Sequence, residues 1–425
     1  MTTYKKILNI ALPAMAENFL QMLMGMVDSY LVASLGLVAI SGVSVAGNVI
    51  TIYQAIFIAL GAAVSSLISK SLGEGNRDNL AYHTNEAIKL TLILSVFLGL
   101  LSLIFGRQIL AWLGTEPVVA NAGGLYLALI GGTILLLGLM TTLGSLIRAT
   151  SNPRMPMYIS FLSNLLNVLF SSLAIFIFHM GIIGVALGTI LARLVGILIL
   201  WKELSLPLAP WSWKLDWELL RLSLPAAGER LMMRAGDVVI IAIIVKFGTA
   251  AVAGNAIGEV LTQFNYMPGF AVATATVMLV AHAVGQADFQ TVRKLTKQTY
   301  WLSLGLMLLV ALLIFAFGQP LTHLYTKDSG AVTASLSVIL FSLLGVPMTA
   351  GTVIYTAVWQ GLGNAKLPFY ATTVGMWLIR IVAGYFLGVT LGLGLLGVWT
   401  ATLLDNTFRW IFLQIIYQRK MRKIT

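Results

Sequence analysis

Long runs of apolar residues alternate with short polar segments along the whole chain. A helix that crosses the hydrocarbon core of a membrane needs about 20 predominantly apolar residues, and these runs are close to that length or longer. The pattern predicts twelve membrane-spanning helices and no separate soluble domain. The predicted spans are residues 8–32, 42–69, 88–112, 121–147, 156–178, 184–201, 223–245, 252–283, 299–318, 332–358, 368–390 and 397–417.

The composition is that of a membrane protein. Of the 425 residues, 59% are hydrophobic and only 10% are charged, whereas soluble domains carry about 25% charged residues. The predicted fold class is therefore an all-α polytopic membrane protein. Cysteine is absent, so we expect no disulfide and no thiol chemistry. The first span follows Lys5 and Lys6 without a small-residue cleavage site, so we expect it to be retained and not to be a signal peptide.

The formal net charge of +11 does not indicate a nucleic-acid partner, because the basic residues are dispersed among short loops. Loops rich in Lys and Arg stay in the cytoplasm. If both termini are cytoplasmic, most Lys and Arg residues lie on that side, and the opposite side keeps only Arg107, Lys246 and Lys327. We therefore expect a multi-pass protein of the plasma (inner) membrane with both termini in the cytoplasm.

An internal repeat with an offset of 212 residues runs through the chain. Leu-Pro-Ala at residues 12–14 recurs at residues 224–226, and Glu17 recurs as Glu229. Further pairs in the same register are Gly36 and Gly248, Gly42 and Gly254, Gly73 and Gly285, Gly106 and Gly318, Asn152 and Asn364, and Pro156 and Pro368. Because each repeat holds six spans, both halves enter the membrane the same way round, as in transporters built of parallel repeats.

The repeat predicts two six-helix bundles, an N-lobe at residues 1–201 and a C-lobe at residues 223–425. Residues 202–222 form the longest polar interval, and Trp and Lys together are typical of a membrane interface. We expect this interval to be a cytoplasmic interfacial linker between the lobes. Its tryptophans are Trp211, Trp213 and Trp217.

The first span carries a polar stripe. Glu17, Gln21 and Asp28 fall within about 40° of one another on a helix, and an ionised side chain at bilayer depth costs at least about 2.5 kcal/mol. The stripe is therefore expected to face a water-filled cavity or a partner helix. We interpret Asp28 as a proton or cation site, with a carboxylate held by fixed helix–helix hydrogen bonds as the alternative.

Three later spans also carry polar stripes. Such stripes line a cavity or supply hydrogen bonds between helices. The fifth span has Ser160, Asn164, Asn167 and Ser171; the eighth has Asn255, Glu259, Gln263 and Tyr266; the tenth has Met348, Thr352, Tyr355, Thr356 and Trp359. For the Ser/Asn stripe we favour a cavity.

Other charged residues within the spans have nearby partners on their own helix. Arg234 and Asp237 are spaced i, i+3, and Asp405 and Arg409 are spaced i, i+4, so each pair is predicted to be a structural ion pair. Because Glu17 and Glu229 recur in the repeat, we predict a structural role for both. For Glu259 a coupling, substrate or structural role stays open.

No catalytic motif is visible, and the chain is not expected to be an enzyme. The sequence has no HExxH, P-loop or GxSxG motif. The histidines, His83, His179, His282 and His323, are predicted to be isolated.

Four segments carry a resemblance to a known family. They are Pro13 with Val27-Asp28-Ser29, the GEGNRD segment at residues 73–78, the IRATSNPRMP segment at residues 147–156, and its weaker echo at residues 360–368. With the repeat, these segments resemble the multidrug and toxic compound extrusion (MATE) transporters. The resemblance implies two lobes around a V-shaped cleft, with export of organic cations or amphiphiles in exchange for H⁺ or Na⁺.

The resemblance also assigns residues. Asp28 matches the acidic residue of the family's first helix, which serves coupling, and Asn167 matches an Asn of the fifth helix. Ser171 stands where DinF-like members often have Asp, and Met233 stands where NorM-like members have Glu. The branch, DinF-like or NorM-like, therefore stays open.

The resulting hypothesis is a secondary active multidrug exporter with H⁺ or Na⁺ as coupling ion and no other cofactor or metal. We expect a monomer whose partners are small cationic or amphiphilic substrates and membrane lipids. The predicted coupling residues are Asp28, Asn164, Asn167 and Ser171. The predicted substrate-binding residues are Gln21, Asn48, Gln54, Glu259, Gln263, Tyr266, Tyr355 and Trp359.

Two alternatives stay open. A flippase for lipids or lipid-linked saccharides, with a related fold, would use a basic cavity, for which Arg193, Arg230, Arg234 and Arg380 are available. A non-transporting membrane receptor is disfavoured by the repeat.

Overall fold

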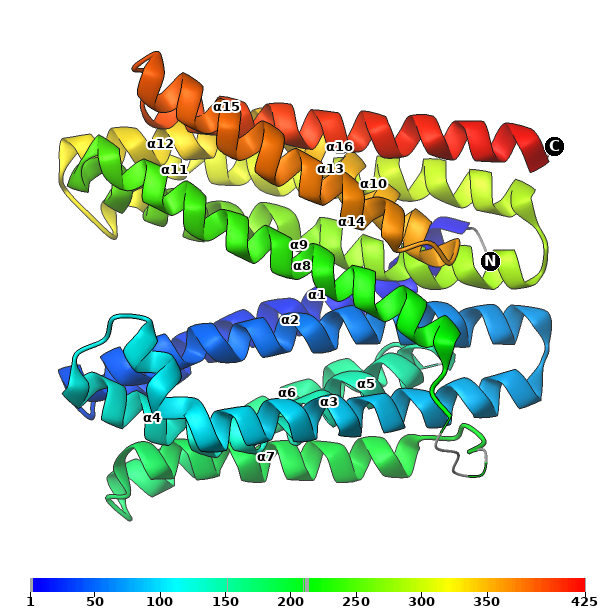
Figure 1. The fold of residues 1–425 in the computed structure, drawn as a ribbon, viewed down its shortest axis with the longest axis horizontal. Coiled ribbons are helices and arrows are strands. Elements are labelled where there is room, and N and C mark those ends of the chain that lie inside the picture. Colours follow the sequence, from blue (N-terminus) through cyan, green and yellow to red (C-terminus); the bar gives the residue numbers. More distant parts are fainter. Residues whose placement is uncertain (1–2, 151, 209, 211–213, 425) are drawn as a thin grey trace. The chain divides into compact units, whose positions relative to one another are not determined.

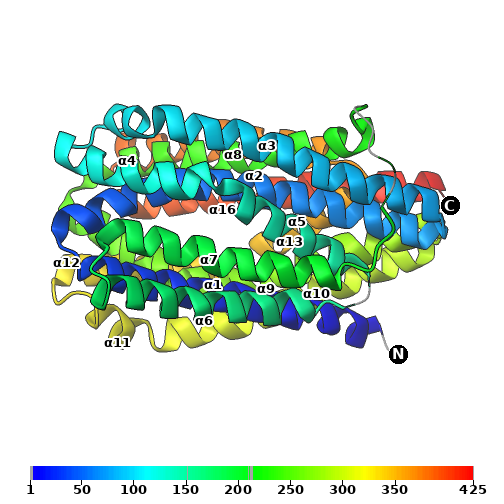
Figure 2. The same ribbon diagram turned by 90° about the horizontal axis from the view of Figure 1, so that it is seen from below.

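The computed structural model describes residues 3–150, 152–208, 210 and 214–424. Within these residues all regular structure is helical and no β-strand occurs (Figure 1, Figure 2). The first half comprises α1 Thr3–Ala33, α2 Leu37–Glu74, α3 Arg77–Trp112, α4 Pro117–Gly132, α5 Ile134–Thr150, α6 Met155–Phe176 and α7 Gly181–Glu203. The predicted all-α class is confirmed.

The second half repeats this order with more interruptions. It comprises α8 Trp217–Ile244, η1 Val245–Phe247, α9 Thr249–Gly285, α10 Phe289–Ala316, α11 Gly318–His323, α12 Ser329–Leu344, α13 Val346–Gly361, α14 Lys366–Thr373, η2 Val374–Ile381, α15 Val382–Tyr385, η3 Phe386–Thr390 and α16 Leu395–Ile424. The segments η2 and η3 are π-helical.

These helices account for the twelve predicted spans. Eight helical stretches are long and apolar enough to cross a membrane, and two bent pairs, α4 with α5 and α12 with α13, pass the same test together. The remaining two predicted spans correspond to α8, with 28 residues, and α16, with 30 residues, which are long enough to cross a membrane but do not pass the same test. Most of these helices extend past the apolar runs because their polar end turns are also helical.

The fourth and tenth spans are not the single straight helices that the sequence predicts. The chain bends by 43° between α4 and α5 and by 57° between α12 and α13. At the first break, the Thr133 hydroxyl donates to the carbonyl of Leu129 (2.7 Å), a local bond that competes with the helical ladder. At the second, Pro347 cannot donate to the preceding turn. The breaks at Thr133 and Gly345 are themselves 212 residues apart.

Equivalent glycines make equivalent contacts in the two halves. Gly36 and Gly248, which precede α2 and α9, have φ angles of 107° and 96°, a conformation that favours glycine. In α2, a Cβ added to Gly42 would lie 2.6 Å from the backbone N of Gly123 in α4. In α9, a Cβ added to Gly254 would lie 2.4 Å from the backbone O of Ala331 in α12. The predicted repeat is therefore a repeat of helix packing.

Contacts divide the chain into two compact units. One contains residues 16–223, and the other contains the chain up to Met15 together with residues 224–425. These bounds differ from the predicted lobes, because Ile7, Ala11 and Ala14 of α1 are buried in a core with Val272 and Val280 of α9. Within that second unit, the first turns of α1 and the last turns of α16 lie at the same end (Figure 1, Figure 2).

Helices α7 and α8 extend into the two ends of the predicted linker, residues 202–222. Helix α8 already begins at Trp217, and Asp216 lies directly before it. Asp216 Oδ1 accepts hydrogen bonds from the backbone N–H groups of Glu218 (2.9 Å) and Leu219 (3.2 Å), which caps the helix. Trp211 and Trp213, whose interfacial role is predicted, lie outside the described residues.

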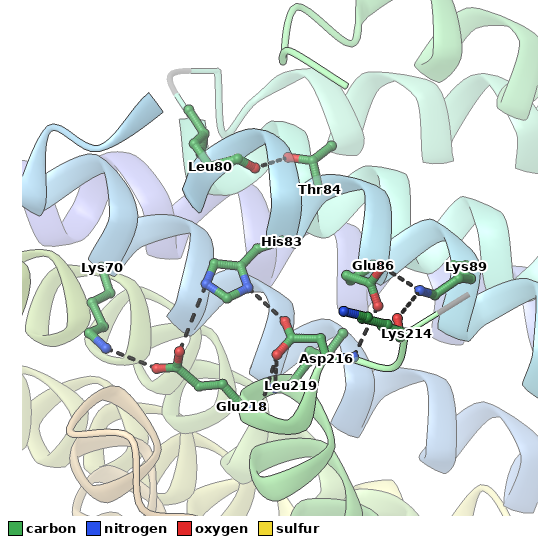
Figure 3. Close-up of polar contacts among 10 residues, drawn as sticks. All are labelled: Lys70, Leu80, His83, Thr84, Glu86, Lys89, Lys214, Asp216, Glu218 and Leu219. Atoms are coloured by element: carbon green, nitrogen blue, oxygen red, sulfur yellow. Dashed lines mark hydrogen bonds and ion pairs between the residues drawn. The ribbon is translucent and has the colours of Figure 1, made fainter. Parts of the chain in front are cut away.

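The prediction that the histidines are isolated is wrong for one of them. His83 Nδ1 of α3 lies 2.7 Å from Asp216 Oδ2 (Figure 3). The two residues are 133 positions apart in the chain, so helical periodicity gives no sign of the pair.

The close contact between α2 and α4 gives a direct test of the packing. We expect Gly42→Ala to lower the free energy of unfolding by about 1–3 kcal/mol, because the added methyl group meets backbone and cannot be accommodated by a side-chain rotation. Gly47→Ala, in the same helix with nothing within 4 Å of the added Cβ, is the matched control and should be neutral or slightly stabilising. Thermal unfolding of both variants in detergent measures the difference; equal melting temperatures would contradict the packing.

Candidate functional site

Asp28, on α1, binds the side-chain amide of Asn167 on α6. Asn167 Nδ2 lies 3.1 Å from Asp28 Oδ1 and 3.2 Å from Oδ2. Asp28 is partly buried and Asn167 is buried. The structure thus places two of the four predicted coupling residues in direct contact, with a neutral donor on the carboxylate, and a third, Ser171, binds Asn167.

The orientation of the Asn167 amide is determined by its own partners. Its Oδ1 accepts hydrogen bonds from Ser171 Oγ (3.1 Å) and Thr189 Oγ1 (3.2 Å). An ionised carboxylate can only accept, so the amide nitrogen faces Asp28 and the amide oxygen faces the two hydroxyls. A Cβ added to Gly188 of α7 would lie 2.4 Å from Ser171 Oγ, which shows how closely α6 and α7 pack here.

Thr189 and Arg193, one turn apart on α7, belong to this site but are absent from the predicted coupling set. The Arg193 guanidinium lies close enough to interact electrostatically with Asp28 and with Tyr126 of α4. Its Nη1 is buried and makes no hydrogen bond within the described residues. The i, i+4 spacing of two polar residues in the predicted sixth span was the available signal.

The fourth predicted coupling residue and three predicted substrate residues stand apart from this hydrogen-bond set. Asn164 Nδ2 is buried, and no described residue accepts a hydrogen bond from it. Gln21 and Asn48 are exposed and Gln54 is partly buried. Ser160 and Ser163 of α6 are buried, and Ser163 donates to the carbonyl of Ala192 (3.0 Å). Ser163 lies beside the predicted stripe and not in it. The stripe members that contact α7 are Asn167, through Thr189, and Ser171, whose Oγ lies 3.5 Å from the carbonyl of Val185; for these two residues hydrogen bonds between helices are observed.

In the other unit, Glu259 and Gln263 lie on an exposed face of α9. Asn255, one turn earlier, hydrogen-bonds to Glu259 and accepts a hydrogen bond from Trp399 Nε1 (3.0 Å). Tyr266 is partly buried, with its hydroxyl 3.5 Å from Ser342 Oγ. The predicted stripe of α9 thus stays on one face of the helix.

The other two predicted substrate residues, Tyr355 and Trp359, lie on α13 and face α16. Trp359 is 2% exposed, and its Nε1 donates to the carbonyl of Leu413 in α16 (3.1 Å). The buried ring of Tyr355 packs edge-on against Tyr417, with 5.6 Å between ring centroids. Their face of α13 packs in a core with α16, and the predicted substrate contact of these two residues stays a prediction.

A charged cluster joins η2 to α16. Asp405 is fully buried and binds Arg409 through two hydrogen bonds (2.8 and 2.9 Å), so the predicted pair is confirmed. Arg380 of η2 also binds Asp405 (Nη2–Oδ2, 2.8 Å) and approaches Asp237 of α8 (Nη1–Oδ1, 3.9 Å). Among the described residues the ion pair of Asp237 is therefore with Arg380 of another helix, and Arg234, the predicted partner, interacts with Asp237 only at longer range.

The two repeated glutamates have different partners. Glu17 forms an ion pair with Arg148 of α5, whereas Glu229 accepts a hydrogen bond from Thr372 Oγ1 of α14 (3.0 Å). Both contacts link helices within one unit, as the predicted structural role requires. The carboxylate of Asp28 has no such ion pair within the described residues.

Comparison with known proteins follows the same division of the chain. A family model described as MatE matches residues 13–173 and again residues 225–386. A relative described as "Probable multidrug resistance protein NorM", from Thermotoga maritima, is 28% identical over 418 residues, which cover 95% of this chain and 90% of the relative.

Solved structures share the fold. A crystal structure described as "MATE in the bent conformation" superposes with a TM-score of 0.92 at 18% identity, over 99% of this chain and 96% of that chain. A transporter of the MOP superfamily from Pyrococcus furiosus superposes with a TM-score of 0.87 at 19% identity, with the same coverage. Its description states that a binding pocket of reversed polarity suggests a different function.

The ion pair of Glu17 and Arg148 allows a test of the predicted structural role of Glu17. Glu17→Gln leaves the guanidinium of Arg148 without its counter-charge, and we expect the free energy of unfolding to fall by about 3 kcal/mol. The double variant Glu17→Gln, Arg148→Gln should recover part of that loss, because no unpaired charge remains. Thermal unfolding of the single and double variants measures both effects. A Glu17→Gln variant as stable as the unmodified protein would contradict the structural role.

Proposed function

This chain belongs to the MatE family, and on that premise we propose that it is a secondary active multidrug exporter. It would move organic cations or amphiphiles out of the cell in exchange for H⁺ or Na⁺, from the plasma membrane and with both termini in the cytoplasm. The observation that carries the proposal is the Asp28 carboxylate, which lies within a span and is held by a neutral amide. The relatives described as multidrug resistance proteins support the substrate class.

Asp28 has the properties of an exchangeable site. Each carboxylate oxygen has about two lone pairs, and Asn167 contributes only one nitrogen donor to the pair of oxygens. The remaining positions can accept a proton, a sodium ion or the cationic group of a substrate. Because these ligands compete for one carboxylate, binding of one favours release of another, and the coupling is reciprocal.

The side chains around Asn167 hold its amide in the same orientation whether or not a ligand is bound to Asp28. Ser171 and Thr189 keep its amide oriented, so little conformational freedom is lost when a ligand binds. The fixed positive charge of Arg193 near Asp28 weakens the binding of any second cation, which favours exchange over permanent occupation. With Ser171 in place of a second carboxylate, we infer that this unit exchanges a single charge.

We propose a separate substrate-binding face in the unit that contains residues 224–425. Glu259, Gln263 and Tyr266 share one face of α9, and the charge of Glu259 interacts with those of Asp237 and Arg380. An exposed carboxylate beside an amide and a phenol suits a cation that also carries aromatic groups.

The arginine-rich spans keep the flippase as the second candidate. An anionic lipid or lipid-linked saccharide would need free guanidinium groups. Arg380, however, binds Asp405 and approaches Asp237, and Arg230 interacts electrostatically with Glu229. These partners leave less positive charge for an anionic cargo and favour the exporter.

Replacement of the carboxylate tests the coupling. We expect Asp28→Asn to abolish energised efflux of ethidium from whole cells while expression and melting temperature stay close to those of the unmodified protein, because the amide is isosteric and uncharged. Asp328→Asn is the control, since Asn replaces Asp well as the N-cap of α12. Efflux is measured with and without an uncoupler and in sodium-free buffer. Full uncoupler-sensitive efflux by Asp28→Asn would refute the role of Asp28.

The C-terminal carboxylate has a separate test in purified protein. Glu259→Gln should weaken binding of a cationic dye by about fivefold, the equivalent of about 1 kcal/mol for a partly exposed charge pair, and leave a neutral dye unaffected. Adding Gln263→Glu to that variant returns a carboxylate one turn away and should restore part of the cation preference. Equal losses for both dyes would remove Glu259 from the substrate site.

A further inference from the structure

The first turns of α3 present three ionisable side chains along one face. His83, Glu86 and Lys89 follow i, i+3, i+6 spacing, and all three are buried, with 8%, 2% and 2% of their surface exposed. Buried charges are rare unless they are paired. Here the partners come from residues 214–219, the segment that leads into α8 (Figure 3).

Two of the three side chains bind the backbone of that segment. The Lys89 ammonium binds the carboxylate of Glu86 and the backbone carbonyl of Lys214. Glu86 Oε2 accepts a hydrogen bond from the N–H of Asp216 (3.1 Å). The path of the chain before α8 is therefore determined by α3.

His83 lies between two carboxylates. Its Nδ1 is 2.7 Å from Asp216 Oδ2, and its Nε2 is 3.9 Å from Glu218 Oε2 (Figure 3). Glu218 is also bound by Lys70 of α2 (2.9 Å). Since Asp216 Oδ1 caps α8 through Glu218 and Leu219, one carboxylate joins the imidazole to the first turn of the helix.

The cluster is specific to the half of the chain that meets the linker. At an offset of 212 residues, the equivalents of His83, Glu86 and Lys89 are Leu295, Gln298 and Trp301, which form no such cluster. The equivalent position of the second half therefore packs with other residues. In the first half, the cluster contacts the segment that leads into α8.

Among the groups of the cluster, imidazole is the one whose charge ordinarily changes between pH 5 and pH 8. Asp216 stays ionised over that range. Burial by itself would raise its pKa, but hydrogen bonds from His83 and from the backbone of Leu219 and Glu218 outweigh burial and lower it. Because folding lowers this pKa, the ionised carboxylate contributes stability at pH values above the ordinary pKa of 3.8. That contribution is lost only as the pH falls through the lowered pKa. The other ionisable groups that face His83 or its partners are Tyr82, Glu86, Glu218, Lys70 and Glu74.

We propose that His83 is a positioning residue that holds the start of α8 against α3 more tightly when its imidazole is charged than when it is neutral. A charged imidazole donates to Asp216 and attracts Glu218, whereas a neutral one keeps at most the hydrogen bond to Asp216. Helix α8 continues without interruption into the other unit, beyond Ser223. The attachment would make this junction sensitive to pH whatever the substrate is.

Amide hydrogen exchange measures directly how tightly the start of α8 is held against α3. The N–H groups of Asp216, Glu218 and Leu219 are each bound by a side chain of the cluster. In the full-length protein in detergent, we expect protection of peptides covering residues 214–220 to be about fivefold higher at pH 6 than at pH 8 after correction for intrinsic rates. Equal protection at both pH values in the unmodified protein would overturn the proposal.

Three variants assign the effect. His83→Gln should lower protection at both pH values and remove the pH dependence, and His83→Lys, with a permanent charge, should keep protection high and independent of pH. His323→Gln, at an exposed histidine of α11, should behave as the unmodified protein. If His83→Gln does not fold, His83→Lys still decides, since an unchanged pH profile in either His83 variant, or its loss in His323→Gln, contradicts the assignment. The measurement needs no transport, so it stands apart from the proposed function.

Discussion

The cost of placing a charge in hydrocarbon organises this structure. An ionised side chain at bilayer depth needs a counter-charge or water, and several charged residues in these helices have a counter-charge on the same helix or on another helix of their unit. Glu17 binds Arg148, and Asp405 binds both Arg409 and Arg380. These polar contacts stabilise each unit. Apolar contacts between membrane-spanning helices contribute less there than in water, because the lipid tails are as apolar as the helices. One carboxylate of α1 has no such ion pair among the described residues.

Asp28 is that carboxylate. Its bonded partner is a neutral amide, and the nearby guanidinium of Arg193 interacts with it without a hydrogen bond. A carboxylate locked into an ion pair has little affinity left for a third charge, whereas one held by an amide keeps lone pairs for a ligand. The proposed exchange therefore depends both on the absence of an ion pair at Asp28 among the described residues and on its hydrogen bond with the Asn167 amide. Asn167, Ser171 and Thr189 supply the orientation without adding charge.

Much of the architecture could be predicted from the sequence because the bilayer sets helix length and the repeat sets the number of bundles. For the site, the spacing within helices predicts Asp28 and Asn167, which are in contact, but it does not identify Thr189 and Arg193 on another helix, nor that Trp359 is buried. Helical periodicity gives the angle of a residue about its own axis and not the helix that it faces. The pairs Asp237–Arg380 and His83–Asp216 join distant segments, and no spacing within one helix could identify them.

The central claim, that a cationic substrate and the coupling ion compete for one carboxylate, is most directly tested by equilibrium binding. The affinity of the purified protein for a cationic fluorescent substrate would be measured over a range of pH and of sodium concentration at constant ionic strength. The account predicts that the apparent Kd rises in proportion to the concentration of one of the two ions, with a slope that corresponds to about one ion displaced per substrate bound. An affinity that is independent of both ions would contradict it.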